Sequence, residues 1–335
     1  MNINEFFNTS KILVIAEIGI NHNGDFEKLI KLIEKAKYSG ADAVKFQIFS
    51  KETFYINERY LPEEIKKNLP LEIFKKVFID YNKYKEAFEY SKKIGLIPFA
   101  TPLDIESFEF LNDIGVELFK VASSDITYIP LLKRISRTKK PVIVSTGFSP
   151  IKEIKKYIKL LEENPTIIMF CVSRYPSKPS DISIPEFMKF RKTFENPKNK
   201  RYVGFSDHTK TLSIPISMVA LGAKAIEKHL TLDENDNSYD NMVSISPEKF
   251  KTMVEMIREL EYTLSTPSRN LPSEFVKKMS MRSFVALNNI TKNQPIEEDN
   301  LEALRPAIFK ECSIENWNKI IGKKSKKDYL PKEPL

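Results

Sequence analysis

Four segments of this chain share one pattern, in which a helix-like stretch ends at a glycine and an apolar run follows at once. The segments are YSGADAVKFQ (38–47), KIGLIPFAT (93–101), DIGVELFKVAS (113–123) and ALGAKAIEKH (220–229). Glycine directly after a helix adopts the left-handed backbone conformation at little cost, which ends the helix. The pattern therefore predicts a repeated helix-to-strand connection and restricts the chain to folds that alternate helices with strands.

The alternation extends over roughly the first 265 residues. Apolar runs predict eight strands, at 12–18, 42–48, 96–100, 117–121, 141–145, 167–172, 202–206 and 224–230. Helical patterns fill the gaps at 26–38, 72–94, 104–114, 128–137, 151–163, 184–194, 211–221 and 247–264. The strands are continuous apolar runs, as expected for parallel strands covered on both faces. Eight such units predict an α/β fold, a (β/α)8 TIM barrel spanning residues 1–264.

An open, doubly wound sheet is the alternative arrangement. Folds of that kind bind dinucleotides through a glycine-rich loop after the first strand. No such loop follows residues 12–18, so the closed barrel is favoured.

The alternation stops after residue 264. The polar stretch STPSRNLPSE (265–274) contains two prolines, which predicts a linker over 265–281. Residues 282–335 contain short strand-like pieces such as RSFVALNNI and PIEEDNLEALRP, which predict a small, mostly β domain. A module of this size holds little core of its own, so we expect it to pack against the barrel or a partner subunit.

The charge balance does not favour a polyanion-binding protein. Lys and Arg number 53 and Asp and Glu 45, a net charge of +8, but the lysines interleave with acidic residues along the whole chain. The run KKSKKD (323–328) has no aromatic residues interleaved with its lysines for base stacking, so we expect no nucleic-acid partner. No apolar run approaches the ~20 residues of a membrane span, and MNINEFFNTSK does not resemble a signal peptide. Two widely separated cysteines, Cys171 and Cys312, fit a reducing cytoplasm.

Polar side chains gather at the ends of the predicted strands, where the active sites of such barrels lie. The first strand ends in EIGINHNGD (17–25). We expect one mouth to collect these residues: Glu17, His22, Lys45, Gln47, Thr101, Lys120, Ser123, Asp125, Ser145, Ser173, Tyr175, Ser206, His208, Glu227 and His229.

All three histidines of the chain, His22, His208 and His229, fall at these ends. A single histidine there is more often a hydrogen-bonded core residue, but three of three favour function. His208 and His229 follow adjacent strands, and two facing imidazoles suit a divalent transition metal such as Mn, Fe, Co or Zn better than an all-oxygen Mg site. Glu17 could hold a metal-bound water.

Lys45 and Lys120 lie within otherwise apolar strands, and a buried ammonium needs an anionic partner. One interpretation pairs them with Glu17, Asp125 or Glu227 in a structural network. The other makes them part of a basin that binds phosphate and carboxylate groups, together with Thr101, Ser123, Ser145 and Ser206.

Seven motifs resemble, in order, those of the sialic acid (N-acetylneuraminate) synthase family, which includes legionaminate- and pseudaminate-type nonulosonic acid synthases. They are AEIGINHNGD, GADAVKFQ, FATPLDIESFEFL, FKVASSDI, KPVIVSTG, VGFSDHT and AIEKHLTLD. The resemblance runs from about residue 12 to 232. It resumes at RSFVALNNITKNQPIEEDNLEALRP and IGKKSKKD, which are similar to the family's C-terminal antifreeze-like (SAF) domain.

The resemblance implies a transferase that condenses phosphoenolpyruvate with an open-chain N-acetylated hexosamine, either N-acetylmannosamine or a diacetamido-hexose. Phosphate leaves by C–O cleavage. His208 and His229 would hold a divalent metal, Mn²⁺ in first place with Mg²⁺ and Co²⁺ as alternatives, and Glu17 would act on water. The phosphoenolpyruvate positions are Lys45, Thr101, Lys120, Ser123, Ser145 and Ser206.

The sugar positions implied by the resemblance are Gln47, Asp125, Ser173, Tyr175, Asp240 and Arg305. Arg305 matches an arginine that reaches the sugar from the other subunit of a domain-swapped homodimer. Here the chain also departs from the family. FCVSRYP (170–176) adds Arg174, Asn241 replaces a histidine after Asp240, and RPAIFKECSI stands where a glycine-containing loop is common. The acceptor therefore stays open, with a sugar-phosphate or spore-coat-type acceptor, or a non-catalytic sugar-binding homologue, as alternatives.

Overall fold

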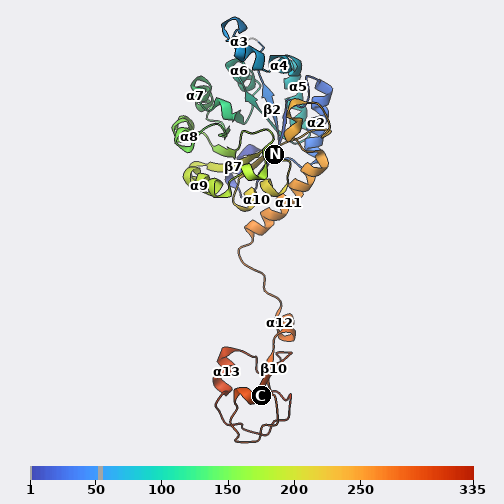
Figure 1. Ribbon diagram of the computed structural model, residues 1–335, viewed down its shortest axis with the longest axis vertical. Coiled ribbons are helices and arrows are strands. Elements are labelled where there is room, and N and C mark those ends of the chain that lie inside the picture. The colour runs from blue at the N-terminus through green and yellow to red at the C-terminus, as the bar shows by residue number, and fades with distance from the viewer. Residues whose placement is uncertain (1, 52–55) are drawn as a thin grey trace. The chain divides into compact units, whose positions relative to one another are not determined.

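The structure is a computed structural model that describes residues 2–51 and 56–335. The chain divides into two compact units, Met1–Ser265 and Thr266–Leu335, and each is described by itself (Figure 1).

The first unit is a closed barrel of eight parallel strands in sequential order, which confirms the predicted fold. The strands are β1 (Leu13–Gly19), β2 (Ala43–Ile48), β3 (Ile97–Pro102), β4 (Phe119–Val121), β5 (Val142–Ser145), β6 (Thr166–Cys171), β7 (Arg201–Asp207) and β8 (Ala225–His229). The circle closes where β1 pairs with β8, with Leu13 opposite Ala225 and Glu17 opposite His229.

Helices connect the strands around the barrel (Figure 1). They are α2 (Phe26–Tyr38), α4 (Leu71–Val77), α5 (Tyr81–Lys93), α6 (Ile105–Asp113), α7 (Ile129–Thr138), α8 (Ile151–Ile158), α9 (Ile184–Phe194), α10 (Ser213–Ala220) and α11 (Pro247–Ser265). The glycines of the four repeated segments all have positive φ, between +71° and +96°, as the sequence predicts. The helix expected over 72–94 is divided, because the Asp80 side chain accepts a hydrogen bond from the Asn82 amide and begins α5 there.

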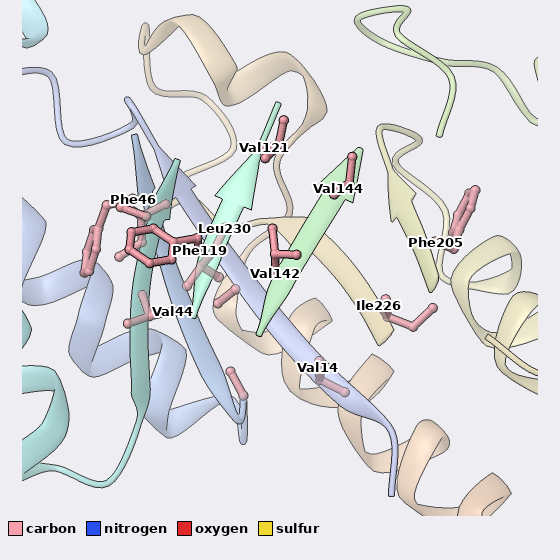
Figure 2. Packing of buried hydrophobic residues seen from close by; sticks show 14 of the residues in the cluster. Val14, Val44, Phe46, Phe119, Val121, Val142, Val144, Phe205, Ile226 and Leu230 are labelled. Carbon is pink, nitrogen blue, oxygen red and sulfur yellow. The ribbon is translucent and has the colours of Figure 1, made fainter. Parts of the chain in front are cut away.

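Two apolar layers lie on opposite faces of the strands, because successive strand residues face opposite sides. The outer layer includes Val14 and Val44, which belong to one buried cluster with Leu29 and Leu32 of α2; Figure 2 shows this layer on neighbouring strands. The inner layer fills the barrel with Leu13, Ile15, Ala43, Ile97, Phe99, Leu118, Ile143, Ile167, Met169 and Ala225.

A short helix that the sequence pattern does not predict, α1 (Ile3–Asn8), packs against the inner layer. Ile3, Phe6 and Phe7 are at most 2% exposed and join the same cluster as Leu13 and Phe99. Because these strand residues lie toward the beginnings of their strands, α1 closes the N-terminal end of the barrel with apolar side chains.

The connection from β2 to α5 adds two short helices, α3 (Glu63–Asn68) and α4. Phe74 of α4 packs edge-on against Phe49, with ring centroids 5.2 Å apart. This small cluster places α4 beside the C-terminal ends of the strands.

The second unit contains helices α12 (Glu274–Ser280) and α13 (Ile314–Ile320) and an antiparallel pair of strands, β9 (Ser283–Ala286) and β10 (Leu301–Leu304). Its core consists of Phe284, Ile296, Leu301 and Ile320. Helix α12 lies within the 265–281 range predicted as linker. Within the described parts of the chain, no helix combines the length and apolar character needed to cross a membrane.

Candidate active site

A cavity of about 270 Å³ opens at the C-terminal ends of the barrel strands. Of the fifteen residues expected at the mouth, fourteen line this cavity, with side chains from all eight strands or the loops that follow them. They are Glu17, Lys45, Gln47, Thr101, Lys120, Ser123, Asp125, Ser145, Ser173, Tyr175, Ser206, His208, Glu227 and His229.

The polar floor of this cavity continues the inward-facing series of each strand. On β1, Leu13 and Ile15 belong to the inner apolar layer, and Glu17 is the next residue on that face. On β8, Ala225 is followed in the same way by Glu227 and His229. The strands therefore place these charges directly above a dry apolar layer.

Glu227, which the sequence places at the mouth and offers as a partner for the lysines, is the centre of a buried charge network. Lys120 Nζ lies 3.0 Å from both of its carboxylate oxygens, and Lys45 Nζ lies 3.2 Å from Glu227 Oε1 and 3.2 Å from Glu17 Oε2. The Ser206 hydroxyl donates to Glu227 Oε1 at 3.0 Å. The position of Glu227 two residues before His229, on the same strand face, agrees with this placement, whereas the family resemblance implies no catalytic or binding role for Glu227.

Both interpretations of the lysines describe part of this arrangement. Lys45 and Lys120 are paired with Glu17 and Glu227, and they also line the cavity. Asp125 is not a partner of either lysine in the recorded ion pairs among the described residues. Its Oδ2 atom is buried without a hydrogen-bond partner there, and burial raises the pKa of Asp125 to about 6.

The ionisable groups of this network have pKa values that are shifted in different directions. Burial raises the pKa of Glu17 to about 7, although Lys45 opposes the shift. Burial also acts to raise the pKa of Glu227, but Lys120 and Lys45 outweigh it and hold that pKa far below its ordinary value. Burial lowers the pKa of Lys120 to about 8 against the attraction of Glu227. Glu17 is thus the carboxyl group that can exchange a proton near neutral pH.

His208 and His229 face the cavity with ring centroids 5.7 Å apart. His208 Nδ1 is 2.8 Å from the Val172 carbonyl, and the Tyr175 ring lies over His208 with centroids 4.2 Å apart. Burial lowers the pKa of both imidazoles, so they are neutral at physiological pH.

This pair has the chemistry of metal ligands. Neutral imidazole nitrogens bind divalent metals, and a ligating histidine commonly directs its other ring nitrogen to a carbonyl, as His208 does. Nδ1 of His229 is buried and, among the described residues, has no hydrogen-bond partner. In that same part of the chain no group of three or more His, Cys, Asp or Glu side chains is arranged to hold a metal, so protein ligands beyond these two are not indicated.

His22 is a correction to the expectation that all three histidines serve the site. It lies outside the cavity, fully buried, where its Nδ1 accepts from the Gly24 amide at 3.0 Å and its Nε2 is 3.3 Å from the Tyr84 hydroxyl. Tyr84 also donates to the Gln47 carbonyl at 3.1 Å, and the Gln47 amide donates to Glu17 Oε1 at 3.0 Å. His22 is therefore a hydrogen-bonded core residue behind the cavity wall.

The sugar-side predictions divide three ways. Gln47, Asp125, Ser173 and Tyr175 line the cavity. Asp240 lies behind its wall, with Oδ2 3.7 Å from His229 Nδ1, while Arg305 belongs to the second unit.

Other side chains refine this part of the site. Arg174 is exposed and pairs with Asp181 at 3.0 Å. Three apolar residues that the sequence analysis missed, Phe74, Leu103 and Phe148, line the cavity. They follow different strands, and nothing in their local sequence marks them.

Comparison with known proteins identifies relatives over most of the chain. A sequence profile of the NeuB family matches residues 32–269. N,N'-diacetyllegionaminic acid synthase of Campylobacter jejuni is 33% identical over 96% of this chain and 98% of its own length. Pseudaminic acid synthase of the same species is 30% identical over 98% and 96%. The crystal structure of N-acetylneuraminic acid (sialic acid) synthetase from Leptospira borgpetersenii superposes with a TM-score of 0.69, at 29% identity, over 78% of this chain and 88% of that one.

Proposed function

This chain belongs to the NeuB family, and on that premise we propose a role for each group of residues in its cavity. Its relatives are legionaminic, pseudaminic and sialic acid synthases, and the chain is a nonulosonic acid synthase, a phosphoenolpyruvate-dependent condensing enzyme of the sialic acid synthase type. The observation that carries the residue roles is the convergence of two lysines, two carboxylates and two imidazoles in one cavity.

Phosphoenolpyruvate would occupy the part of the cavity lined by Lys45 and Lys120. Both ammonium groups are pre-positioned by Glu17 and Glu227, so binding would not require them to be ordered first. The Ser145 hydroxyl is buried and lacks a hydrogen-bond partner among the described residues, which suits it to an anionic oxygen. Thr101, Ser123 and Ser206 line the same region and would complete the contacts to phosphate and carboxylate.

His208 and His229 would hold a divalent cation, for which we propose Mn²⁺, with Mg²⁺ and Co²⁺ as alternatives. When bound, such a cation supplies Lewis acidity toward the aldehyde oxygen of the acceptor. The two imidazoles contribute by being neutral and fixed, through the Val172 carbonyl and the Tyr175 ring.

The reaction would form a bond between the methylene carbon of phosphoenolpyruvate and the aldehyde carbon of the sugar, whose oxygen becomes a hydroxyl by gaining one proton, equivalent to the proton that the attacking water loses. Water then adds to the carbon that carries the phosphate, and C–O cleavage releases phosphate and leaves a 2-keto acid. Glu17 would take the proton from that water, because its pKa of about 7 suits a general base. Gln47 orients it through Oε1.

We propose an unphosphorylated, N-acetylated hexosamine as the acceptor. The cationic side chains recorded among the cavity-lining residues are Lys45 and Lys120, both at the phosphoenolpyruvate end, and Arg174 is paired with Asp181 outside it. A sugar-phosphate acceptor would therefore lack a second phosphate site. Phe74, Leu103 and Phe148 suit the methyl groups of acetamido substituents instead.

The second unit would serve as an antifreeze-like domain in a domain-swapped homodimer. Two kinds of support exist: its sequence resemblance over residues 282–306 and 321–328, and the exposed apolar side chains it presents, such as Ile308 and Phe309 at 57% and 58% exposure. Arg305 of one subunit would then reach the sugar in the other. A cytoplasmic location stays a prediction.

Phosphate release from phosphoenolpyruvate tests the function directly. Mn²⁺-loaded enzyme should release phosphate with N-acetylmannosamine or a diacetamido-hexose and yield a nine-carbon 2-keto acid by mass spectrometry. His208→Ala and His229→Ala should abolish turnover without unfolding the barrel. Full activity after chelation would refute the metal role. No release with any hexose, from folded and metal-loaded protein, would refute the condensation. Release with hexose 6-phosphates alone would favour the sugar-phosphate alternative.

A further inference from the structure

A buried ion pair joins the two strands that carry His208 and His229. Lys228 Nζ lies 2.6 Å from Asp207 Oδ2, and both side chains are 0% exposed. Asp207 and Lys228 are partners in the register of β7 and β8. Asp207 directly precedes His208 and Lys228 directly precedes His229, so the pair lies one residue from each imidazole.

The contacts of this pair continue around His208. The Thr209 amide donates to Asp207 Oδ1 at 2.9 Å, and the Thr209 hydroxyl lies 3.2 Å from Oδ2. Lys228 Nζ also donates to the Thr209 carbonyl. The ion pair therefore includes the residue before His208 and contacts the residue after it.

Asp207 and Lys228 face away from the cavity. Their neighbours Ser206, His208, Glu227 and His229 line it, and successive strand residues point to opposite faces. Neither side chain can contact a ligand in the cavity, and the backbone that carries the two histidines is the structural link between the ion pair and such a ligand.

We propose that Asp207 and Lys228 are positioning residues that fix the separation and orientation of His208 and His229 toward one shared divalent cation. The inference rests on the proposed metal-binding role of the two histidines. A buried ion pair is weak evidence for stability, since a well-packed apolar pair of similar volume is often equally stable. An apolar pair cannot form the hydrogen bonds that Asp207 and Lys228 make with Thr209. These hydrogen bonds fix the backbone around His208, and with it the position of His208 relative to His229.

The test is D207L/K228M, which removes both charges together and leaves no unpaired buried ion. Purified full-length variant and wild type are titrated with Mn²⁺ by calorimetry in the absence of substrates, and the Co²⁺-loaded proteins are compared by electronic absorption. We expect Mn²⁺ to bind about tenfold more weakly to the variant, at the low end of what ligand-orienting residues cost, and the Co²⁺ spectrum to change. Those readouts report ligand geometry, which a purely structural pair would leave unmoved.

D42L/R258M is the matched control. It removes another largely buried ion pair, with Arg258 Nη2 2.6 Å from Asp42 Oδ2, located just before β2 at the opposite end of the barrel. We expect its Mn²⁺ affinity to equal that of the wild type, even where its melting temperature falls.

Unchanged Mn²⁺ affinity in folded D207L/K228M would overturn the inference. Loss of affinity in both double variants would overturn it as well, because the effect would then be general. A wild type that binds no Mn²⁺ or Co²⁺ at all would instead refute the proposed metal role, and the inference with it. If D207L/K228M does not fold, K228R replaces it, since Arg keeps the charge but moves the donors. Weaker Mn²⁺ binding by K228R at an unchanged melting temperature supports the inference, and unchanged binding overturns it.

Discussion

The two ends of the barrel are built from the same strands and differ in almost every property. At the N-terminal end, inward-facing residues such as Leu13 and Phe99 pack with Phe6 of α1 into a dry core. At the C-terminal end, the next inward-facing positions carry Glu17, Lys45 and Glu227 in a charge network. Burial raises the pKa of Glu17, whereas Lys120 and Lys45 outweigh burial and lower that of Glu227, so the chemistry of the C-terminal end depends on which charges meet there.

The proposed reaction centre is therefore defined by residues of the strands more than by residues of the loops. Lys45, Lys120 and Glu227 lie within strands whose neighbours are hydrogen-bonded on both sides. Side chains on such elements hold their positions better than side chains on loops. The proposed sugar contacts Ser173 and Tyr175 follow β6 in a connecting segment, where substitutions can alter specificity without disturbing the charge network.

Glu227→Ala should have the largest effect, because it removes the carboxylate paired with buried Lys120 and leaves Lys45 with Glu17 alone. We expect a loss of about 3–5 kcal/mol in the free energy of unfolding and loss of phosphate release. Urea unfolding and the phosphate assay measure the two effects. Glu72→Ala, which removes an exposed pair with Lys75, is the control and should change stability by less than about 1 kcal/mol. Similar stability of the two variants would contradict the expected cost of leaving a buried charge without its partner.

Phe6→Ala should be comparably destabilising but kinetically silent. Removing a fully buried aromatic side chain from the apolar end costs about 3–5 kcal/mol, measured by urea unfolding, while KM for phosphoenolpyruvate stays unchanged at temperatures where the variant is folded. Glu5→Ala, on the exposed face of the same helix, is the control. A large change in KM would mean that the two ends are mechanically coupled.

The pH dependence of kcat/KM should report the protonation states of the charge network at the C-terminal end of the barrel. Activity should rise as pH increases through about 7, where Glu17 loses its proton, and fall above about 8, where Lys120 loses its positive charge. The profile belongs to the coupled network rather than to isolated groups. Glu17→Gln should remove the acidic limb together with most of the activity. An acidic limb near the ordinary glutamate value of 4.5 would contradict the assignment.

Tyr84→Phe should have the smallest effect. It removes the hydroxyl that contacts His22 and the Gln47 carbonyl while its ring packing against Phe46 remains. We expect a stability loss of about 0.5–1.5 kcal/mol, and a decrease in kcat through Gln47 and Glu17 of up to about tenfold, equivalent to about 1.4 kcal/mol. Tyr90→Phe on the same helix, whose hydroxyl donates to exposed Glu34, is the control for loss of a tyrosine hydroxyl. Equal behaviour of the two variants would show that the contacts behind the cavity are not transmitted to it.

The local sequence determined the fold and most of the membership of the site. A glycine after each of four helices and eight apolar runs specify the alternation, because both signals act over a few residues. Once the strands are parallel neighbours in one barrel, their ends must share a mouth, and fourteen of the predicted residues line one cavity.

Which of these side chains meet depends on the closure of the barrel. Lys120 and Glu227 are 107 residues apart, and a strand's period of two gives the face of a residue but not its partner across the barrel. For the same reason, His22 lies next to the end of the first strand but contacts Tyr84 outside the cavity. Helix α1 closes the N-terminal end of the barrel, although no sequence pattern predicts it. Local preferences act between near neighbours, whereas ion pairs and burial arise when the closed barrel brings distant strands within a few ångströms.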